Sequence, residues 1–220
     1  MAGFQVAIDG PAGSGKSTIS KLIADRLKMT HIDTGAMYRA VTLIAIERQI
    51  DLNDESQYLF LESIRISYHD DHIYVDNRNV EEEIRTKEVT KNVSLVSSFP
   101  YVRRKMVELQ KMAAEAGDVV MDGRDIGTVV MPNAQVKVFL TAKVEERAKR
   151  RHREKLEKGH DVNLEKIVEE LVTRDIKDST RKESPLKKAD DAIEIDTTHL
   201  TIDQTVEKII GLIRSAKGEL

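Results

Sequence analysis

Residues 4–18 read FQVAIDGPAGSGKST, and this stretch decides the fold. An apolar run at 4–8 leads into a glycine-rich segment, and amphipathic residues 19–28 follow it. The order is that of a strand, a loop and a helix, and the loop meets the spacing G-x-x-x-x-G-K-[ST] in full. Glycine reaches positive φ without a Cβ penalty, so this loop can turn several backbone N–H groups toward one anion. The stretch therefore predicts a phosphate-binding loop at the N-terminus of a helix, whose dipole adds positive potential.

The side chains of this loop have separate tasks. Lys16 offers a mobile cation to the β- and γ-phosphates, and the Ser17 hydroxyl is a suitable ligand for Mg²⁺. A flexible loop with a chance lysine is the alternative, which the preceding strand disfavours. We therefore predict a nucleoside triphosphate with Mg²⁺ as its cofactor, held by Gly10, Pro11, Ala12, Gly13, Ser14, Gly15, Lys16, Ser17 and Thr18.

Length and composition restrict the class of protein. The 220 residues suffice for one α/β domain with an insertion or lid. Hydrophobic residues make up 40% of the chain and charged residues 33%, which indicates a globular protein rich in surface helix. The formal net charge of −3 disfavours a nucleic-acid binder, and the absence of cysteine excludes disulfides and thiolate metal sites. No apolar run approaches the ~20 residues of a membrane span, and no signal peptide is seen. We expect a cytoplasmic monomer without membrane or nucleic-acid partners.

Strands and helices alternate along most of the chain. We expect strands at 4–8, 31–33, 118–122, 136–141 and 192–196, and helices at about 15–28, 36–49, 81–99, 101–116, 144–162, 163–181 and 200–216. This order predicts an α/β fold of three layers, in which helices cover both faces of a five-stranded parallel sheet. Residues 64–80 instead alternate apolar and polar at period two, which predicts a small antiparallel insertion with turns at 69–72 and 76–79.

Five further motifs follow the phosphate loop in order. They are DTGAMYRA at 33–40, EIRTKEV at 83–89, SFPYVRRKM at 98–106, DGRDIGTVV at 122–130 and RDIKDSTR at 174–181. The series resembles the bacterial cytidylate kinases, within the nucleoside monophosphate kinase family of P-loop proteins, over essentially the full length. The resemblance implies transfer of the γ-phosphoryl of ATP to CMP or dCMP in pyrimidine nucleotide metabolism, with Mg²⁺.

The resemblance also implies how the chain is divided. It predicts a P-loop kinase fold with a core sheet, a monophosphate-binding insertion and a mobile helical lid. We expect a single domain over 1–220, with the core at about 1–55, 98–145 and 180–220, the insertion at about 56–97 and the lid at about 146–179.

Phosphoryl transfer between two anions requires cations on both sides of the gap. Arg39 and Arg124 follow turns at strand ends, on the rim that carries the phosphate loop, where ligands of open sheets bind. The resemblance implies that both hold the CMP phosphate, for which the planar guanidinium is suited. Surface ion pairs are the alternative for either arginine.

Cytosine presents an amino donor beside two acceptors, so a protein that reads it needs a carboxylate together with arginine or hydroxyl donors. Asp125, Arg103, Arg181 and Thr34 match the base-reading positions of the family. Asp125 would repel the carbonyl that uracil carries at the amino position, so we expect CMP to be preferred over UMP. Asp125 as a mere turn former after Gly123 stays open.

The remaining CMP contacts rest on the resemblance. Ser94, Arg174 and Asp178 correspond to positions that contact the sugar, although Arg174 and Asp178 stand at i and i+4 and could simply pair. The complete CMP set is Thr34, Tyr38, Arg39, Ser94, Arg103, Arg124, Asp125, Arg174, Asp178 and Arg181.

The basic helix expected at 144–162 supplies cations to the lid. We expect Arg150 and Arg151 to reach the transferring phosphoryl when the lid closes, with Arg147 as a weaker candidate. A solvated helix face is the alternative for such a run of charges. The predicted catalytic set is Lys16, Arg124, Arg150 and Arg151.

No catalytic base is proposed, because the acceptor is an ionised phosphate oxygen. Two other points stay open at this stage. Asp9 and Asp122 each end a strand near the Mg²⁺ position and could orient metal-bound water or accept hydrogen bonds there. A different small-molecule P-loop kinase and a P-loop switch are competing functions; the base-reading residues disfavour the first, and the acceptor-side arginines disfavour the second.

Overall fold

Five parallel strands form the main sheet in the order β2-β6-β1-β7-β8. The structure, a computed structural model, describes residues 3–69, 72–157, 159 and 162–219. The strands are β1 (Gln5–Asp9), β2 (Thr30–Asp33), β6 (Val119–Gly123), β7 (Val136–Thr141) and β8 (Ile193–Asp196). Val6, Ala7 and Ile8 of the central strand are all buried, as expected for a parallel strand covered on both faces. The predicted sheet is confirmed, with strand ends within one residue of those expected.

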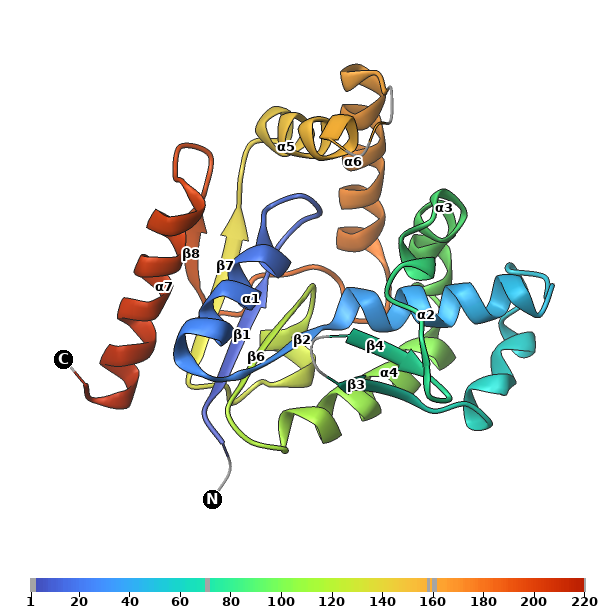
Figure 1. Cartoon of the computed structure of the whole chain (residues 1–220), viewed down its shortest axis with the longest axis horizontal. Coiled ribbons are helices and arrows are strands. Elements are labelled where there is room, and N and C mark those ends of the chain that lie inside the picture. The colour runs from blue at the N-terminus through green and yellow to red at the C-terminus, as the bar shows by residue number, and fades with distance from the viewer. Residues whose placement is uncertain (1–2, 70–71, 158, 160–161, 220) are drawn as a thin grey trace.

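Helices cover both faces of this sheet and make the fold three-layered (Figure 1). On one face α1 (Lys16–Leu27) packs beside α7 (Ile202–Lys217), and their isoleucines form one apolar cluster with β1 and β7. On the other face α2 (Thr34–Glu47) and α4 (Pro100–Ala114) join a second cluster with β6. None of the helices among the described residues is both long and apolar enough to cross a membrane.

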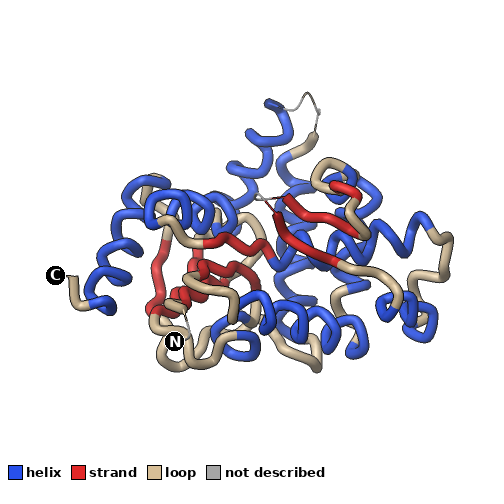
Figure 2. The backbone as a smooth tube through the Cα atoms, turned by 60° about the horizontal axis from the view of Figure 1, so that its bottom comes forward, coloured by secondary structure: helices blue, strands red, loops and turns tan. Residues whose placement is uncertain are grey.

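The expected antiparallel insertion is present as a second sheet, apart from the first (Figure 2). It consists of β3 (Ile66–His69), β4 (His72–Val75) and β5 (Arg78–Asn79). Asp76 and Asn77 both have positive φ, which fits a tight two-residue turn between β4 and β5. Residues 70 and 71 of the turn expected at 69–72 lie outside the described part of the chain.

Three local elements differ from the sequence prediction. One helix was expected over 81–99, but a 3-10 turn, η2 (Glu83–Arg85), precedes a shorter α3 (Lys87–Val96). Thr86 separates them because its backbone is extended and its hydroxyl accepts a hydrogen bond from Val89 N, which caps α3. The 3-10 segment η1 (Glu55–Glu62) and the π-helical turn η3 (Ile126–Val130) were not predicted.

A helical hairpin, α5 (Val144–Glu157) and α6 (Leu164–Thr180), stands over the loop that joins β1 to α1 (Figure 1). Ala12 of that loop forms a small apolar cluster with Ala148, Ile167 and Leu171 of the hairpin. The basic helix was expected to continue to residue 162; α5 ends at Glu157, and residues 158, 160 and 161 are outside the described chain. The hairpin is therefore packed directly on the predicted phosphate loop.

Candidate active site

The carboxyl ends of β1, β6 and β2 lie at the same rim of the sheet, since the three strands are parallel neighbours. The glycine loop follows β1, Arg124 and Asp125 follow β6, and Thr34 follows β2. Ligands of open α/β sheets bind at this rim. The topology thus gathers segments that are far apart in the sequence and that carry the predicted site residues.

The glycine loop has the backbone that its sequence predicts. Gly10 has φ 150°, and a Cβ there would lie 2.0 Å from the Leu140 carbonyl oxygen, so only glycine permits this approach to β7. Gly13 and Gly15 also have positive φ, and Gly15 precedes the first residue of α1. The loop therefore ends at a helix N-terminus, whose free N–H groups and dipole favour an anion.

Lys16 is buried beneath this loop. Its Nζ donates to the Pro11 carbonyl oxygen at 2.8 Å. Burial, followed by the nearby positive charge of Arg124, lowers the pKa of Lys16 to about 7, although Asp122 and Asp9 act in the opposite direction. Lys16 and Arg124 are thus close enough to repel each other, and an anion between them would relieve both.

The structure separates the two carboxylates that the sequence left equivalent. Asp122 accepts a hydrogen bond from Ser17 Oγ at 2.8 Å, and its other oxygen lies 2.8 Å from His31 Nε2. Asp9 instead accepts from the backbone N–H groups of Ile126 and Gly127, at 2.9 and 2.8 Å. Asp9 therefore holds the turn η3, and Asp122 is the carboxylate beside the predicted metal ligand.

Asp9 gives a pH-dependent prediction. Burial is the main cause that raises its pKa from 3.8 to about 6. As pH rises, the unfolded chain releases this proton first, so ionisation of Asp9 lowers the free energy of unfolding between about pH 4 and 6. We expect the Asp9→Asn variant to gain about 2 kcal/mol relative to the parent between pH 4 and pH 7. Urea unfolding of both proteins at the two pH values measures this difference, and an equal difference at both would contradict it.

The predicted base-reading residues form a buried ion-pair network. Arg103 Nη2 lies 2.5 Å from Asp125 Oδ2, and Arg181 Nη2 lies 3.6 Å from Asp125 Oδ1. The Arg103 guanidinium also lies over the Tyr38 ring, 5.3 Å from its centroid. Thr34 Oγ1 donates to the Asp122 carbonyl oxygen at 2.7 Å. The Asp125 side chain thus pairs with two arginines, which is more than a turn former needs.

Asp178 of α6 is the second hub of this network. Its Oδ2 lies 2.9 Å from Arg124 Nε, but 4.0 Å from Arg174 Nε. Burial acts to raise the pKa of Asp178, but Arg124 and Arg174 hold it below its ordinary range. The close partner of Asp178 is therefore Arg124, and the i,i+4 pair with Arg174 is the weaker contact.

Donors without acceptors are concentrated in this region. Arg103 Nε, Arg174 Nε and Arg181 Nη2 are buried and have no hydrogen-bond partner within the described parts of the chain. Burial, together with the charge of Arg124, lowers the pKa of Arg174 to about 9. Buried donors normally find an acceptor, and crowded cations need a counter-charge. The cluster is chemically suited to an anionic, acceptor-rich ligand.

Arg39 lies on α2 and Ser94 on α3, two helices that pack against each other. Arg39 Nη1 donates to the Thr90 hydroxyl at 2.9 Å and to the Ile84 carbonyl at 3.2 Å. Burial lowers the pKa of Arg39 to about 10. Ser94 is partly buried on α3, and its carbonyl accepts from the Ser97 hydroxyl. Arg39 is thus placed by the segment that precedes and begins α3.

The two predicted hairpin cations have different surroundings. The Arg150 guanidinium donates to the Thr197 carbonyl at 2.6 Å and to its hydroxyl at 3.1 Å, after β8. Arg151 is close enough to Arg39 and Arg174 to lower the pKa of both, after the larger effect of burial. Arg151 therefore adds to the positive potential at Arg39 and Arg174, whereas Arg150 is bound to Thr197.

His31 and Asp175 were not predicted from the sequence. His31 is buried in β2 and contacts Asp122, and Asp175 of α6 contacts Arg147. A polar residue within the short apolar strand before DTG was the available signal for His31. For Asp175 no signal distinguished it from the other charges of a highly charged helix.

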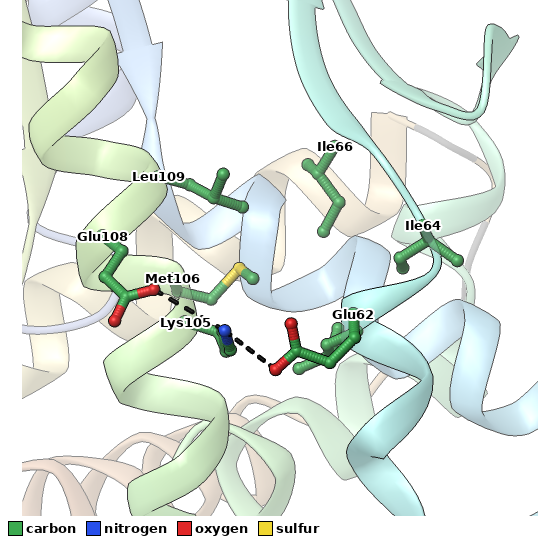
Figure 3. A pocket seen from close by; sticks show the side chains of 8 residues that line it. Glu62, Ile64, Ile66, Lys105, Met106, Glu108 and Leu109 are labelled. Carbon is green, nitrogen blue, oxygen red and sulfur yellow. Dashed lines mark ion pairs between the residues drawn. The ribbon is translucent and has the colours of Figure 1, made fainter.

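A pocket of about 170 Å³ opens between η1, β3 and α4 (Figure 3). Leu61, Ile66 and Met106 are among its apolar lining residues, and Lys105 Nζ forms an ion pair with Glu62 at 2.8 Å beside it. None of the predicted site residues lines this pocket. We therefore do not assign the substrates to it.

Among the described residues, no group of three or more histidine, aspartate or glutamate side chains is arranged to hold a metal ion. Ser17 and Asp122 nevertheless offer a hydroxyl and a carboxylate side by side at the glycine loop. This set suits a cation that is held mainly by substrate phosphates and water, as Mg²⁺ commonly is.

A phosphate loop after the central strand of a parallel sheet, with an arginine cluster at the same rim, defines a P-loop kinase. The model of the family "Cytidylate kinase" matches residues 6–215. The chain belongs to the cytidylate kinase family.

Individual relatives agree with this family. The cytidylate kinase of Acholeplasma laidlawii (strain PG-8A) is 66% identical over 218 residues, which are 99% of this chain and 98% of that protein. The cytidylate kinase of Bacillus thuringiensis (strain Al Hakam) is 49% identical and covers 96% of each chain. An uncharacterized protein from Eubacterium ventriosum ATCC 27560 aligns with a TM-score of 0.53 at 13% identity, over 96% of this chain and 98% of its own, which shows the fold alone.

Proposed function

We propose that the chain transfers the γ-phosphoryl of ATP to CMP or dCMP and releases ADP and CDP or dCDP. The observation that carries this proposal is that Lys16 begins the helix after β1 and Arg124 follows the neighbouring parallel strand β6, so that both lie at one rim of the sheet. Membership of the cytidylate kinase family supports the choice of both substrates.

On the donor side, the backbone of residues 10–15 and the α1 N-terminus receive the ATP phosphates. Lys16 contributes its cation to the β- and γ-phosphates. Ser17 and Asp122 hold Mg²⁺, directly or through water, and the ion supplies charge neutralisation to the phosphates when bound. These groups fix the orientation of the γ-phosphoryl toward the acceptor.

On the acceptor side, Arg39 and Arg124 bind the CMP phosphate. Asp125, fixed by Arg103 and Arg181, accepts from the cytosine amino group. The unpartnered donors of Arg103, Arg174 and Arg181 supply further contacts to the nucleotide. The sugar is contacted by Ser94, Arg174 and Asp178, of which Asp178 accepts hydrogen bonds from the sugar hydroxyls. The acceptor phosphate is already ionised, so the site needs to position and neutralise charge and requires no general base.

Closure of the hairpin α5–α6 is part of the proposal. Residues 146–179 act as the lid, residues 56–97 as the monophosphate-binding insertion, and the rest as the core. Arg151 already lies near the arginine cluster, while Arg150 must leave Thr197 to reach the transferring phosphoryl. We further propose that the enzyme works as a cytoplasmic monomer.

Initial rates with ATP against CMP, dCMP, UMP and AMP test the proposed function. Many turnovers per second with CMP and dCMP, and much slower transfer to UMP and AMP, are expected. A preference for an unrelated acceptor would favour another P-loop kinase. Slow ATP hydrolysis without transfer to any monophosphate would favour a P-loop switch.

Asp125→Asn tests the base assignment. We expect the ratio of kcat/KM for CMP to that for UMP to fall at least about tenfold, because the amide no longer repels the uracil carbonyl. The variant also leaves the Arg103 charge buried without its partner, so its melting temperature should fall. The substrate ratio is internal to each preparation and is independent of this loss of stability. An unchanged ratio would remove Asp125 from base recognition.

A further inference from the structure

Arg147 lies at the junction of the glycine loop, the end of β7 and the helical hairpin. It is buried, with 6% of its surface exposed. Its Nη1 donates to the Ala12 carbonyl at 2.9 Å, and its Nε donates to the Ala142 carbonyl at 2.9 Å. The side chain therefore connects the loop after β1 with the residue after β7, and it does not lie on a solvated helix face.

Asp175 of α6 holds this guanidinium in place. Its Oδ2 lies 2.7 Å from Arg147 Nη1, and the Asp175 side chain is largely buried. A Cβ added at Gly13 would lie 3.3 Å from Arg147 Cβ and 3.4 Å from the Arg147 carbonyl oxygen. The loop therefore also packs tightly against the start of α5. The apolar cluster around Ala12 closes the same junction.

The contact with the Ala12 carbonyl bears on phosphate binding through the planarity of the peptide unit. The Ala12 C=O and the Gly13 N–H belong to one trans peptide and point in opposite directions. A donor that fixes the carbonyl on the outer side of the loop therefore fixes the N–H toward the inner side. Anion-binding loops work through N–H groups that converge in this way.

We propose that Arg147, oriented by Asp175, is a positioning residue that sets the glycine loop for the donor phosphates by holding the Ala12–Gly13 peptide. This inference rests on the proposed use of the loop for the phosphates of ATP. In this role Arg147 binds the backbone of the loop and not the nucleotide. Because Asp175 lies on α6, the position of the hairpin then affects the donor site.

The test compares Arg147→Lys, Asp175→Asn and the control Lys149→Met, an exposed cation of the same helix. Calorimetric titration with ADP, tripolyphosphate and CMP gives three affinities for each protein. We expect Arg147→Lys to lower the affinities for ADP and tripolyphosphate by about tenfold or more. The reason is that the lysine ammonium cannot bridge the Ala12 carbonyl, the Ala142 carbonyl and Asp175 at once. Asp175→Asn should show a smaller loss of the same kind, with CMP affinity within about twofold of the parent in both variants.

The other outcomes would overturn the inference. A loss confined to ADP would mean that Arg147 touches the adenosine, and an equal loss for CMP would indicate general damage to the fold. Unchanged tripolyphosphate affinity in Arg147→Lys would also remove the positioning role. The proposed donor site itself would fail if the parent and Lys149→Met bound CMP but neither bound tripolyphosphate or ADP. That result is distinct from a failure of the positioning role of Arg147.

Discussion

Replacement of Lys16 by methionine is expected to lower kcat with ATP and CMP by about 10³-fold. In the proposed reaction the ammonium group of Lys16 stabilises negative charge on the transferring phosphates, and methionine provides no charge in its place. The melting temperature should stay equal or rise, because methionine removes a buried cation whose pKa is lowered to about 7 mainly by burial. Steady-state rates and thermal unfolding of the same preparation measure both effects.

A matched control for Lys16→Met is Lys21→Met on the exposed side of the same helix. That variant should keep the parental rate. CMP affinity should be similar in all three proteins, since we assign Lys16 to the donor side. A Lys16→Met enzyme that retained a tenth of the parental kcat would show that the loop lysine is not the main source of charge stabilisation.

Arg124→Met should reduce kcat/KM for CMP by about 10³-fold while the affinity for ADP changes little. After burial, the positive charge of Arg124 is the strongest cause that lowers the pKa of Lys16, and the same holds for the pKa of Arg174. In the proposed arrangement, removing Arg124 takes away the cation that faces the donor from the acceptor phosphate. Steady-state kinetics with CMP and calorimetry with ADP separate the two sides.

The loss of Arg124 also removes the closest ion-pair partner of the buried Asp178 carboxylate, whose Oδ2 lies 2.9 Å from Arg124 Nε. The double variant Arg124→Met, Asp178→Asn removes that unpaired charge and should recover stability lost by the single variant. Activity should stay low in the double variant. Recovery of activity together with stability would mean that Arg124 serves the fold and not the acceptor.

The fold could be predicted from the sequence because its signals are local. Apolar runs mark the five buried strands, and the loop from Gly10 to Gly15 places the first strand at a phosphate site. The prediction of one helix over 81–99 was wrong, because it overlooked the local capping signal of Thr86, whose hydroxyl accepts from Val89 N. The 3-10 turn before Thr86 packs against α2, which the local sequence does not show. The π-helical turn at Ile126–Val130 depends on Asp9, which is 117 residues away in the sequence from Ile126 and fixes the turn from β1.

The candidate site was predictable as a set of residues but not as a set of contacts. Motif spacing marked Arg124, Arg174 and Asp178, but it could not tell that Asp178 pairs more closely with Arg124 than with the residue one turn before it. Arg147 and Arg150 look alike in a basic helix. The structure separates them, because one is buried against the glycine loop and the other is bound to Thr197. Such differences arise from tertiary packing, which the sequence pattern does not encode locally. The catalytic and binding roles of these residues remain predictions.

The central claim is that two nucleotides meet end to end between the glycine loop and the arginine cluster. Calorimetric titration with a bisubstrate compound, adenosine and cytidine joined 5′ to 5′ by five phosphates, tests it most directly. One molecule should bind per chain, at least about 10²-fold more tightly than ATP or CMP alone, and should exclude both. An affinity equal to that of ATP, with CMP still able to bind beside the compound, would contradict the shared site.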